Sequence, residues 1–207
     1  MIAVSTSYEL EGRTQQKQRT RAALVAAART LVEEGHAPTV EDAAAAAAIS
    51  RTTAYRYFPN QRALLAAAHP ETDTRSMLPA DPPDDPAARL ELVVRAFTDL
   101  IADSEAQQRT MLRLSLEASD EERRALPLRQ GRAIGWLTEA LSPLRDQLGE
   151  GGLQRLVYAI RSATGIEALA WLTDVAHLSR PEALAVMRWS AQAMYHAAIS
   201  HGPPEAG

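Results

Sequence analysis

A short polar segment near the N-terminus carries the side chains best suited to reading a nucleic acid. Arg51, Thr52, Thr53 and Arg56 occur in the run SRTTAYRYF. Arginine can donate two parallel hydrogen bonds to the edge of guanine, and threonine can hydrogen-bond to a base or touch the thymine methyl group. In a helix these side chains project from the first two turns. The alternative interpretation is an ordinary solvated helix face.

Two short helices are predicted to position these side chains, one before the segment and one containing it. Thr39 with Asp42 three residues later is typical of a helix start, and Ser50 offers a second N-cap. The alanines between them favour a helix and have little bulk, so a second helix can cross closely. Pro59 ends the second helix. This is the helix-turn-helix arrangement, whose second helix enters the DNA major groove.

The stretch TVEDAAAAAAISRTTAYRYFPNQRALL, residues 39–65, resembles the DNA-binding signature of the TetR family of bacterial repressors. It matches in the threonine start, the alanines near the turn, the apolar–serine pair, the Tyr-x-Tyr-Phe end and the paired leucines. The resemblance closely covers only the first third of the chain. Ala48 stands where the family usually has glycine, at a cost of about 1 kcal/mol if its φ is positive. Gln61 stands where the family usually has lysine.

The resemblance implies a DNA-reading domain. It implies that Tyr55 and Phe58 support this domain from inside, while the Tyr57 hydroxyl reaches a phosphate. Thr39 can touch a phosphate because helix N-termini favour anions. Basic residues also cluster over 13–21, where the helix dipole favours acids, so phosphate contact is preferred to a solvated face. The predicted DNA-contacting residues are Lys17, Arg21, Thr39, Ser50, Arg51, Thr52, Thr53, Tyr55, Arg56, Tyr57 and Gln61.

The composition limits the class of protein. The 207 residues include no cysteine, which excludes disulfides, thiolate metal sites and a cysteine nucleophile. The net charge is −4, yet residues 13–68 hold eight basic and four acidic side chains, against 14 and 20 in residues 69–207. Chance fluctuation is the alternative to a DNA-reading head on an acidic body. Without a long apolar run or a signal-peptide pattern, the protein is expected in the cytoplasm, with no membrane partner.

Helical periodicity continues along the chain without strand-like alternation, so the sequence predicts an all-α fold of about nine helices. Residues 1–12 are expected to form a flexible arm before a helix over 16–34. The proline-rich segment 70–86 is interpreted as a linker. It separates a three-helix helix-turn-helix domain (1–68) from a helical ligand-sensing and dimerisation domain (69–207). There, helices are predicted over 127–148 and 153–176, and Asp85–Pro86 and Ser179 with Glu182 mark helix starts.

The second domain offers weaker candidates for function. Side chains that mix apolar bulk with polar groups, as in small-molecule pockets, are Met111, Trp136, Tyr158, Arg161, Thr164 and Trp171. Ordinary core or interface packing is the alternative for each. The last two helices resemble the family's dimerisation bundle, in which small residues allow close approach and tryptophan fills gaps. The predicted interface residues are Ala168, Ala183, Met187, Trp189, Ala191 and Met194.

No enzyme motif is present in the sequence. The five histidines form no metal-spaced set with a carboxylate, so no catalytic, metal or cofactor site is predicted. The sequence predicts a homodimeric repressor that leaves a near-palindromic operator in double-stranded DNA when a small, largely apolar inducer binds the second domain. The alternatives are a DNA-binding regulator without a small-molecule ligand and a helical adaptor that binds only protein. The adaptor leaves the polar segment 51–57 unexplained.

Overall fold

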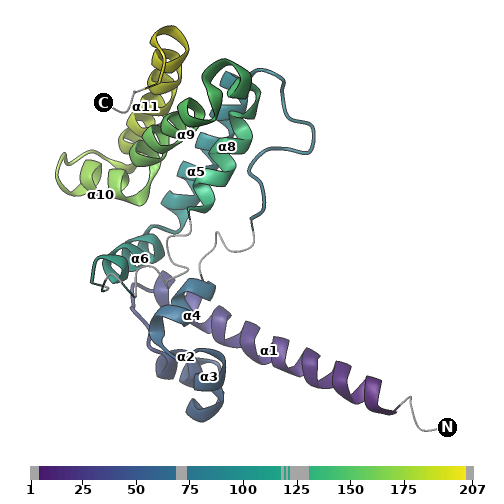
Figure 1. Ribbon diagram of the computed structural model, residues 1–207. Helices are drawn as coiled ribbons and strands as arrows, with labels where there is room; N and C mark the ends of the chain where they lie inside the picture. Colours follow the sequence, from purple (N-terminus) through teal and green to yellow (C-terminus); the bar gives the residue numbers. More distant parts are fainter. Residues whose placement is uncertain (1–4, 69–73, 118, 120, 122–130, 204–207) are drawn as a thin grey trace. The chain divides into compact units, whose positions relative to one another are not determined.

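The computed structural model describes residues 5–68, 74–117, 119, 121 and 131–203, and Figure 1 shows their helices. Every regular element within these ranges is a helix, so the all-α prediction is confirmed. The chain divides into two compact units. The first lies within residues 1–72 and 113–128, and the second within residues 73–112 and 129–207. We call residues 5–68 the head and the described residues of the second unit the body.

The head contains α1 (Ser5–Glu33), α2 (Val40–Ala46), α3 (Arg51–Tyr57) and α4 (Gln61–Ala68). The first three form the predicted helix-turn-helix arrangement, in which α1 packs against α2, and α2 against α3. α4 packs against α1. The core of the head consists of Leu24, Val25, Ala28, Val40, Ala43, Ala44, Ala54, Phe58, Leu64 and Ala68. Half of these are alanine, whose small side chain allows the short helices to pack closely.

Local hydrogen bonds fix the two helix starts. The Thr39 hydroxyl accepts a hydrogen bond from the Asp42 N–H (3.2 Å), and the Asp42 carboxylate accepts one from the Thr39 N–H (2.8 Å). The Ser50 hydroxyl accepts the Thr53 N–H at 3.3 Å. Both predicted caps are confirmed. Between them Ala48 has a φ of 54°, so the turn does require the left-handed conformation.

α1 begins earlier than expected. The flexible arm predicted for residues 1–12 is wrong for residues 5–12, which are helical. The prediction relied on apolar periodicity, and this segment has none. It also contains no proline, and its glutamate and leucine residues favour a helix without any apolar face. Residues 14–19 of α1 are exposed, and from residue 14 onward the first buried side chain is Leu24. Several turns of α1 therefore precede the head core.

The body is built mainly from α5 (Pro86–Asp103), α8 (Arg132–Ala140), α9 (Arg145–Thr164), α10 (Ile166–Asp174) and α11 (Arg180–His201). It also contains a 3₁₀ turn (Ser142–Leu144) and the start of α6 (Glu105–Glu117), whose last residues fall in the first unit. α5, α8, α9 and α11 pack around one core. The largest side chains of this core that are almost completely buried are Leu90, Phe97, Ile101, Leu137, Leu141, Leu153, Leu156, Ile160 and Leu169.

Two helices predicted for the body are interrupted. Residues 127–130 of the predicted helix 127–148 lie outside the described residues. The rest of it is divided between α8 and α9 by the 3₁₀ turn that contains Pro143. Gly149 then interrupts α9 with a φ of 67°. The helix predicted over 153–176 ends at Thr164, because Gly165 is extended (φ −88°, ψ 176°) and α10 starts after it. Glycine, which tolerates non-helical backbone, thus interrupts α9 at residue 149 and separates α9 from α10 at residue 165.

Residues 74–85 pack against the helices of the body, and the boundary between the two compact units, between residues 72 and 73, lies inside the segment interpreted as a linker. The Trp136 indole N–H donates to the Arg75 carbonyl (3.2 Å), and the Ser76 hydroxyl donates to the Glu139 carboxylate (2.7 Å). Two apolar side chains of the segment pack on the body core, Met77 and Leu78. Prolines prevent a helix here, but they do not prevent docking. Residues 70–73 of the predicted linker lie outside the described residues.

Candidate DNA-binding interface

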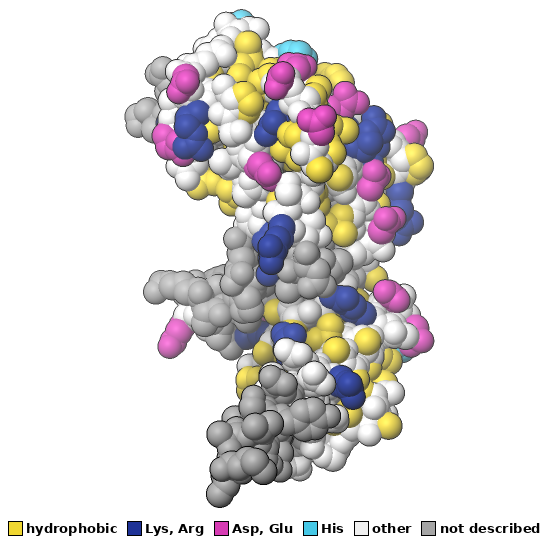
Figure 2. All heavy atoms as spheres, turned by 90° about the vertical axis from the view of Figure 1, so that its right-hand side faces the viewer, with side chains coloured by type: hydrophobic (Ala, Val, Ile, Leu, Met, Phe, Trp, Pro, Cys, Tyr) yellow, Lys and Arg dark blue, Asp and Glu magenta, His cyan; other side chains and the backbone are white. Residues whose placement is uncertain are grey.

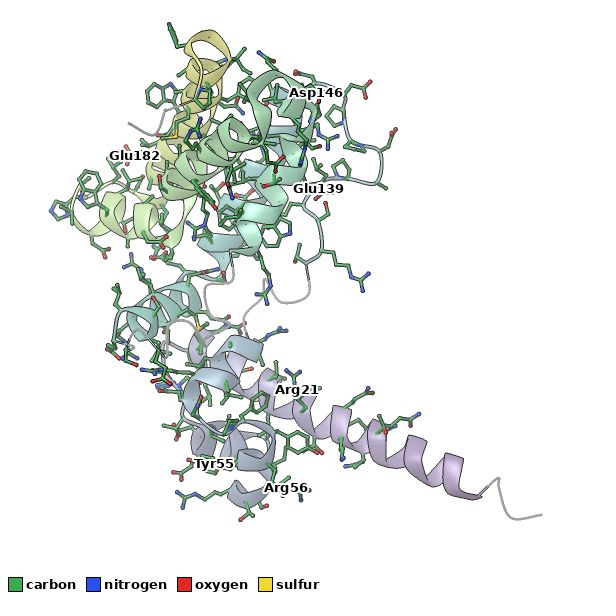
Figure 3. The ribbon with its side chains drawn as sticks, in the orientation of Figure 1. Arg21, Tyr55, Arg56, Glu139, Asp146 and Glu182 are labelled. Atoms are coloured by element: carbon green, nitrogen blue, oxygen red, sulfur yellow. The ribbon has the colours of Figure 1, made fainter. Side chains whose placement is uncertain are left out.

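α3 places its side chains on two distinct faces. Ala54 and Phe58, one turn apart, are 0% and 3% exposed. The exposed side chains are Arg51, Thr52, Tyr55 and Arg56. Figure 3 shows Tyr55 and Arg56 projecting outward from α3. Because residues i and i+4 share a helix face, the burial of Ala54 and Phe58 turns the polar side chains to solvent.

The burial of the two tyrosines of α3 is the reverse of what the family resemblance implies. Tyr55, expected inside the domain, is 45% exposed, whereas Tyr57 is partly buried and packs against the head core. Tyr57 follows the buried Ala54 by three residues, which keeps it on the inner side. Tyr55 follows Ala54 by one residue, which rotates it about 100° away. The internal support role predicted for Tyr55 is therefore wrong, and its exposed ring is free to meet DNA.

Three predicted contact residues also serve the caps. The Ser50 hydroxyl donates to the Thr53 hydroxyl oxygen at 2.8 Å. The Thr39 hydroxyl donates to the Asp42 carboxylate at 2.7 Å. This hydrogen bond, together with that from the Thr39 backbone, lowers the pKa of Asp42. The structure gives these hydroxyls a capping role, and their contact with DNA stays a prediction.

Three further predicted contacts come from the flanking helices. Lys17 is exposed on α1. One turn later, the Arg21 guanidinium lies 5.4 Å from the centre of the Phe58 ring, which links α1 to the end of α3. Gln61 donates its amide N–H groups to the carbonyl oxygens of residues 37 and 38, at 2.8 and 3.1 Å. The Gln61 nitrogen thus holds the segment before α2, a role that the sequence did not indicate.

Arg51 differs from the other exposed side chains of α3 because it forms an ion pair. Its Nη2 contacts the Glu41 carboxylate of α2, while the two side chains remain 69% and 41% exposed. The hydrogen bond to Glu41 raises the pKa of Arg51 further above its ordinary value. The sequence alone does not indicate this role for Glu41, because an acid in the first turn of a helix already has an ordinary explanation in the helix dipole.

A comparison with protein-family models matches residues 23–68 to bacterial regulatory proteins of the tetR family. The match runs from within α1 to the end of α4 and so includes both caps, the turn and all of α3. This chain carries the tetR-family domain. It is accordingly a DNA-binding transcriptional regulator. A comparison with curated proteins found none that matches it. Among the helices that the structure describes, none is long and apolar enough to cross a membrane.

Outside the tetR-family domain, two of the predicted pocket residues, Trp136 and Arg161, both contact the ring of Phe97. The ring centres of Trp136 and Phe97 are 6.0 Å apart, and the Arg161 guanidinium lies 5.6 Å from the centre of the Phe97 ring. Arg161 also pairs with Glu167 at 3.4 Å. A Cβ atom at Gly165 would overlap both charged groups, so the break between α9 and α10 makes room for this pair.

The other predicted pocket residues do not join this group by any contact we observe. Tyr158 and Trp171 are 48% and 58% exposed, and their contact with a ligand stays a prediction. Met111 and Thr164 are buried, and the Thr164 hydroxyl donates to the Ile160 carbonyl at 2.8 Å. Tyr158 directly follows the buried Val157, and adjacent helix positions point to different sides.

Five of the six predicted dimer residues lie on different sides of α11, and the sixth, Ala168, lies on α10. Three of them are 0% exposed and belong to the core of their own protomer: Ala183, Met187 and Ala191. Because buried side chains cannot meet a second subunit, their assignment to the interface is wrong. Ala168 and Met194 are partly buried against the same core. Trp189 is 71% exposed. The apolar stripe through the three buried residues is the face with which α11 packs on α5 and α9.

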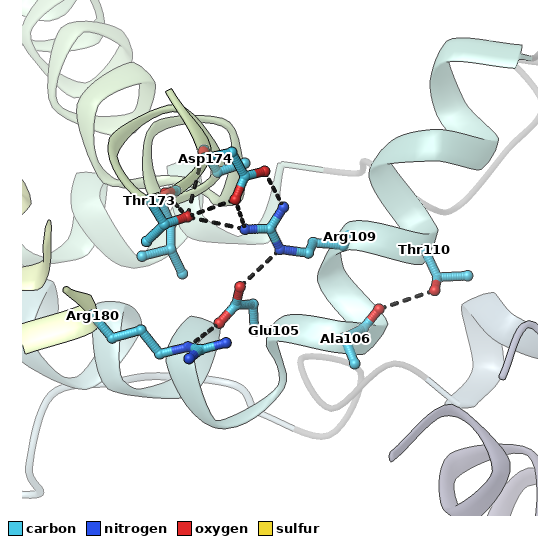
Figure 4. A network of polar contacts seen from close by, with 9 residues as sticks. Glu105, Ala106, Arg109, Thr110, Thr173, Asp174 and Arg180 are labelled. Atoms are coloured by element: carbon cyan, nitrogen blue, oxygen red, sulfur yellow. Dashed lines mark hydrogen bonds and ion pairs between the residues drawn. The ribbon is translucent and has the colours of Figure 1, made fainter. Parts of the chain in front are cut away.

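Figure 4 shows a charged cluster joining α6, α10 and the start of α11. Arg109 donates to Asp174 at 2.6 Å and to Glu105 at 2.7 Å, and Glu105 also accepts from Arg180 at 2.5 Å. Burial raises the pKa of Glu105, but hydrogen bonds from Arg180 and Arg109 outweigh this, so the pKa is lowered. The sequence analysis missed the cluster because Asp174 lies 65 residues from Arg109.

Proposed function

We propose that the protein is a homodimeric repressor that releases a near-palindromic operator when a small, largely apolar molecule binds the body. The observation that carries the DNA-reading part is the exposed polar face of α3, held between the capped start of α2 and the buried Phe58. Arg51, Thr52 and Arg56 can donate to base edges or phosphates in the major groove. A regulator of this kind works where the chromosome is, in the bacterial cytoplasm.

The charge distribution supports the same function. Residues 13–68 have twice as many basic as acidic side chains, while residues 69–207 are acidic overall. Figure 2 shows acidic and basic side chains intermixed over the body. A basic head attracts the phosphate backbone, while an acidic body does not compete for it.

Two substitutions separate base reading from phosphate contact. Arg56→Ala is expected to weaken binding to the preferred duplex by about 1–3 kcal/mol and to relax preference at one base pair. Lys17→Ala is expected to weaken binding to every duplex and to reduce the salt dependence, as d log K/d log [salt], by about one. Fluorescence anisotropy at several salt concentrations measures both effects, with a duplex selected from a randomised pool and an unselected duplex.

The same selection tests the predicted symmetry. Two heads related by a two-fold axis read inverted half-sites about one helical turn apart or slightly more, so the selected sequences should be inverted repeats. Unrelated or single half-sites would argue against a symmetric dimer on DNA. If Arg56→Ala left affinity and base preference unchanged, the face of α3 identified above would not be the reading face.

The ligand part of the proposal rests on the group formed by Phe97, Trp136 and Arg161. Two aromatic rings supply apolar contact, and a guanidinium, already shared with Glu167, can orient a polar end of a ligand. A ligand alters DNA binding only by preferring one of two arrangements of the protein. A coupling of about 1–3 kcal/mol would lower operator affinity about 5–150-fold.

A two-stage screen tests this part. Small apolar compounds that raise the melting temperature of the protein are then added to its complex with the selected duplex. Compounds that release the DNA support a ligand-responsive repressor. Compounds that raise the melting temperature but leave DNA affinity unchanged favour the alternative, a regulator without a small-molecule switch.

A further inference from the structure

The ion pair between Glu41 and Arg51 joins two rigidly held helix starts. Glu41 is the second residue of α2, whose first turn is fixed by the capping box of Thr39 and Asp42. Arg51 is the first residue of α3, which Ser50 caps. The Cα positions of Glu41 and Arg51 are therefore set by the turn, and the carboxylate reaches the guanidinium across it.

We infer that Glu41 is a positioning residue for Arg51, which holds the guanidinium in one orientation on the DNA-facing side and thereby sets base preference. This inference rests on the proposed reading of DNA by α3. Arginine presents five N–H donors in a planar fork, and the pair with Glu41 uses the Nη2 side. Because the Arg51 side chain is 69% exposed, the remaining donors can reach a base while the pair stays formed.

Preorganisation gives the pair its effect on preference. A free arginine side chain has many rotamers, and base contact must freeze them, which weakens binding. If Glu41 holds the guanidinium before DNA binds, less side-chain freedom is lost when Arg51 contacts the base pair that matches this orientation. The fixed orientation also prevents the guanidinium from turning toward other base pairs. The hydrogen bond that fixes it also raises the pKa of Arg51, in keeping with a charged pair.

The carboxylate also acts on unselected DNA. Glu41 is 41% exposed beside the reading face, so its negative charge repels phosphates of every sequence alike. Glu41 thus lowers affinity for random DNA while it sharpens the choice of base. A residue whose only role was to repel phosphate would change affinity for all sequences and leave base preference unaltered.

The test compares four proteins, the wild type, Glu41→Ala, Arg51→Ala and the double variant, on the selected duplex and its single-base variants. Glu41→Ala should bind random DNA about 2–5-fold more tightly. It should also lose about 5–100-fold of the discrimination at one base pair. Arg51→Ala should lose discrimination at the same base pair. The double variant should lose no more than Arg51→Ala alone, because Glu41 acts through Arg51.

Two controls distinguish positioning from general effects. Glu34→Ala removes an exposed acid at the end of α1 and should leave base preference unchanged. Glu41→Gln keeps an acceptor oxygen without the charge and should retain part of the discrimination, with an unaltered circular dichroism melt. Unchanged base preference in Glu41→Ala, or additive losses in the double variant, would overturn the inference. If Arg51→Ala kept its base preference, both the inference and base reading by Arg51 would fail. If the wild type bound no duplex at all, the proposed function itself would fail.

Discussion

Ala48 shows how a single residue shapes the recognition turn. Its φ of 54° lies in the left-handed region, where a Cβ atom raises the energy of the backbone by about 1–2 kcal/mol. The turn nevertheless forms, since Ala43, Ala44 and Ala54 are buried on either side of it. The head therefore keeps a strained alanine at the point that sets the crossing of α2 and α3.

Ala48→Gly is expected to stabilise the head by about 0.5–1 kcal/mol, because relief of the left-handed strain exceeds the entropy that glycine adds to the unfolded chain. Ala45, exposed within α2, is the matched control. Ala45→Gly should destabilise by about 1 kcal/mol, since there glycine only weakens a helix. Urea unfolding followed by far-ultraviolet circular dichroism measures both. Shifts of the same sign in the two variants would contradict a strained turn.

At the scale of the elements, the features predicted best from the sequence are those fixed by contacts between neighbouring residues, such as helix starts. The starts at Thr39, Ser50, Asp85 and Ser179 are all capped in the structure, because a cap and its N–H groups lie within three residues of each other. The docking of segment 74–85 depends on Trp136, about sixty residues away. Periodicity found the apolar stripe of α11 but could not say whether its own protomer or a second one covers it.

The orientation of α3 could have been read from the sequence more fully. Ala54 and Phe58 are four residues apart, so they define one face, and Tyr57 adjoins that face while Tyr55 does not. The family resemblance implies an internal position for Tyr55, whereas this spacing indicates an exposed one. The pairing of Arg51 with Glu41 could not be predicted from the sequence. It depends on the angle between α2 and α3, and the turn at Ala48 sets that angle.

The charged cluster of α6, α10 and α11 leads to a prediction at the scale of elements. Arg109→Ala should destabilise the body by about 1–3 kcal/mol, because it leaves Glu105 and Asp174 without their shared donor. Arg95→Ala, which removes an exposed i,i+4 pair with Glu91, should change stability by about 0.5 kcal/mol or less. Chemical unfolding of each variant gives the comparison. Equal effects would show that the cluster contributes no more than a surface pair.

The stability of this cluster should depend on pH. The folded pKa values of Glu105 and Asp174 are lowered, the first despite burial and the second by Arg109 and then Thr173. The folded state therefore binds fewer protons than the unfolded state in acid. The contribution of the two carboxylates to the free energy of unfolding is present above pH 4.5, the ordinary pKa of glutamate, and is lost as the pH falls below that value. The stability difference between wild type and Arg109→Ala should thus narrow from about pH 6 to about pH 3. A constant difference would argue against the cluster as its source.

At the scale of the whole molecule, the outward side of α11 is the strongest candidate for a dimer contact. Trp189 is 71% exposed and lies on the side opposite the buried face of this helix. Ala185 and Ala193 flank it at i−4 and i+4, and Val186 beside it is 39% exposed. A large ring between small neighbours suits the packing of one helix against its symmetry mate. Of the predicted interface residues on α11, this face keeps Trp189, and the contact itself stays a proposal.

Trp189→Glu is expected to dissociate the proposed homodimer, because a second protomer packed on this face would bury an unpaired carboxylate. The protomer should stay folded, since the side chain is exposed in it. Leu92→Glu, at an exposed apolar position on α5, is the matched control and should leave the dimer intact. Sedimentation velocity over a range of concentrations measures the association. A dimer that survives Trp189→Glu would place the contact on another surface.

The position of Lys17 has a practical consequence. It is the single lysine in the 207 residues, so an acylating reagent modifies one side chain of the protein besides the terminal amine. Its ammonium group is exposed on α1, where it should react at the rate of an unhindered amine in the free protein. If α1 lies along a phosphate backbone, DNA will slow this reaction. Mass spectrometry of one tryptic peptide would then report occupancy of any duplex, before the operator is known.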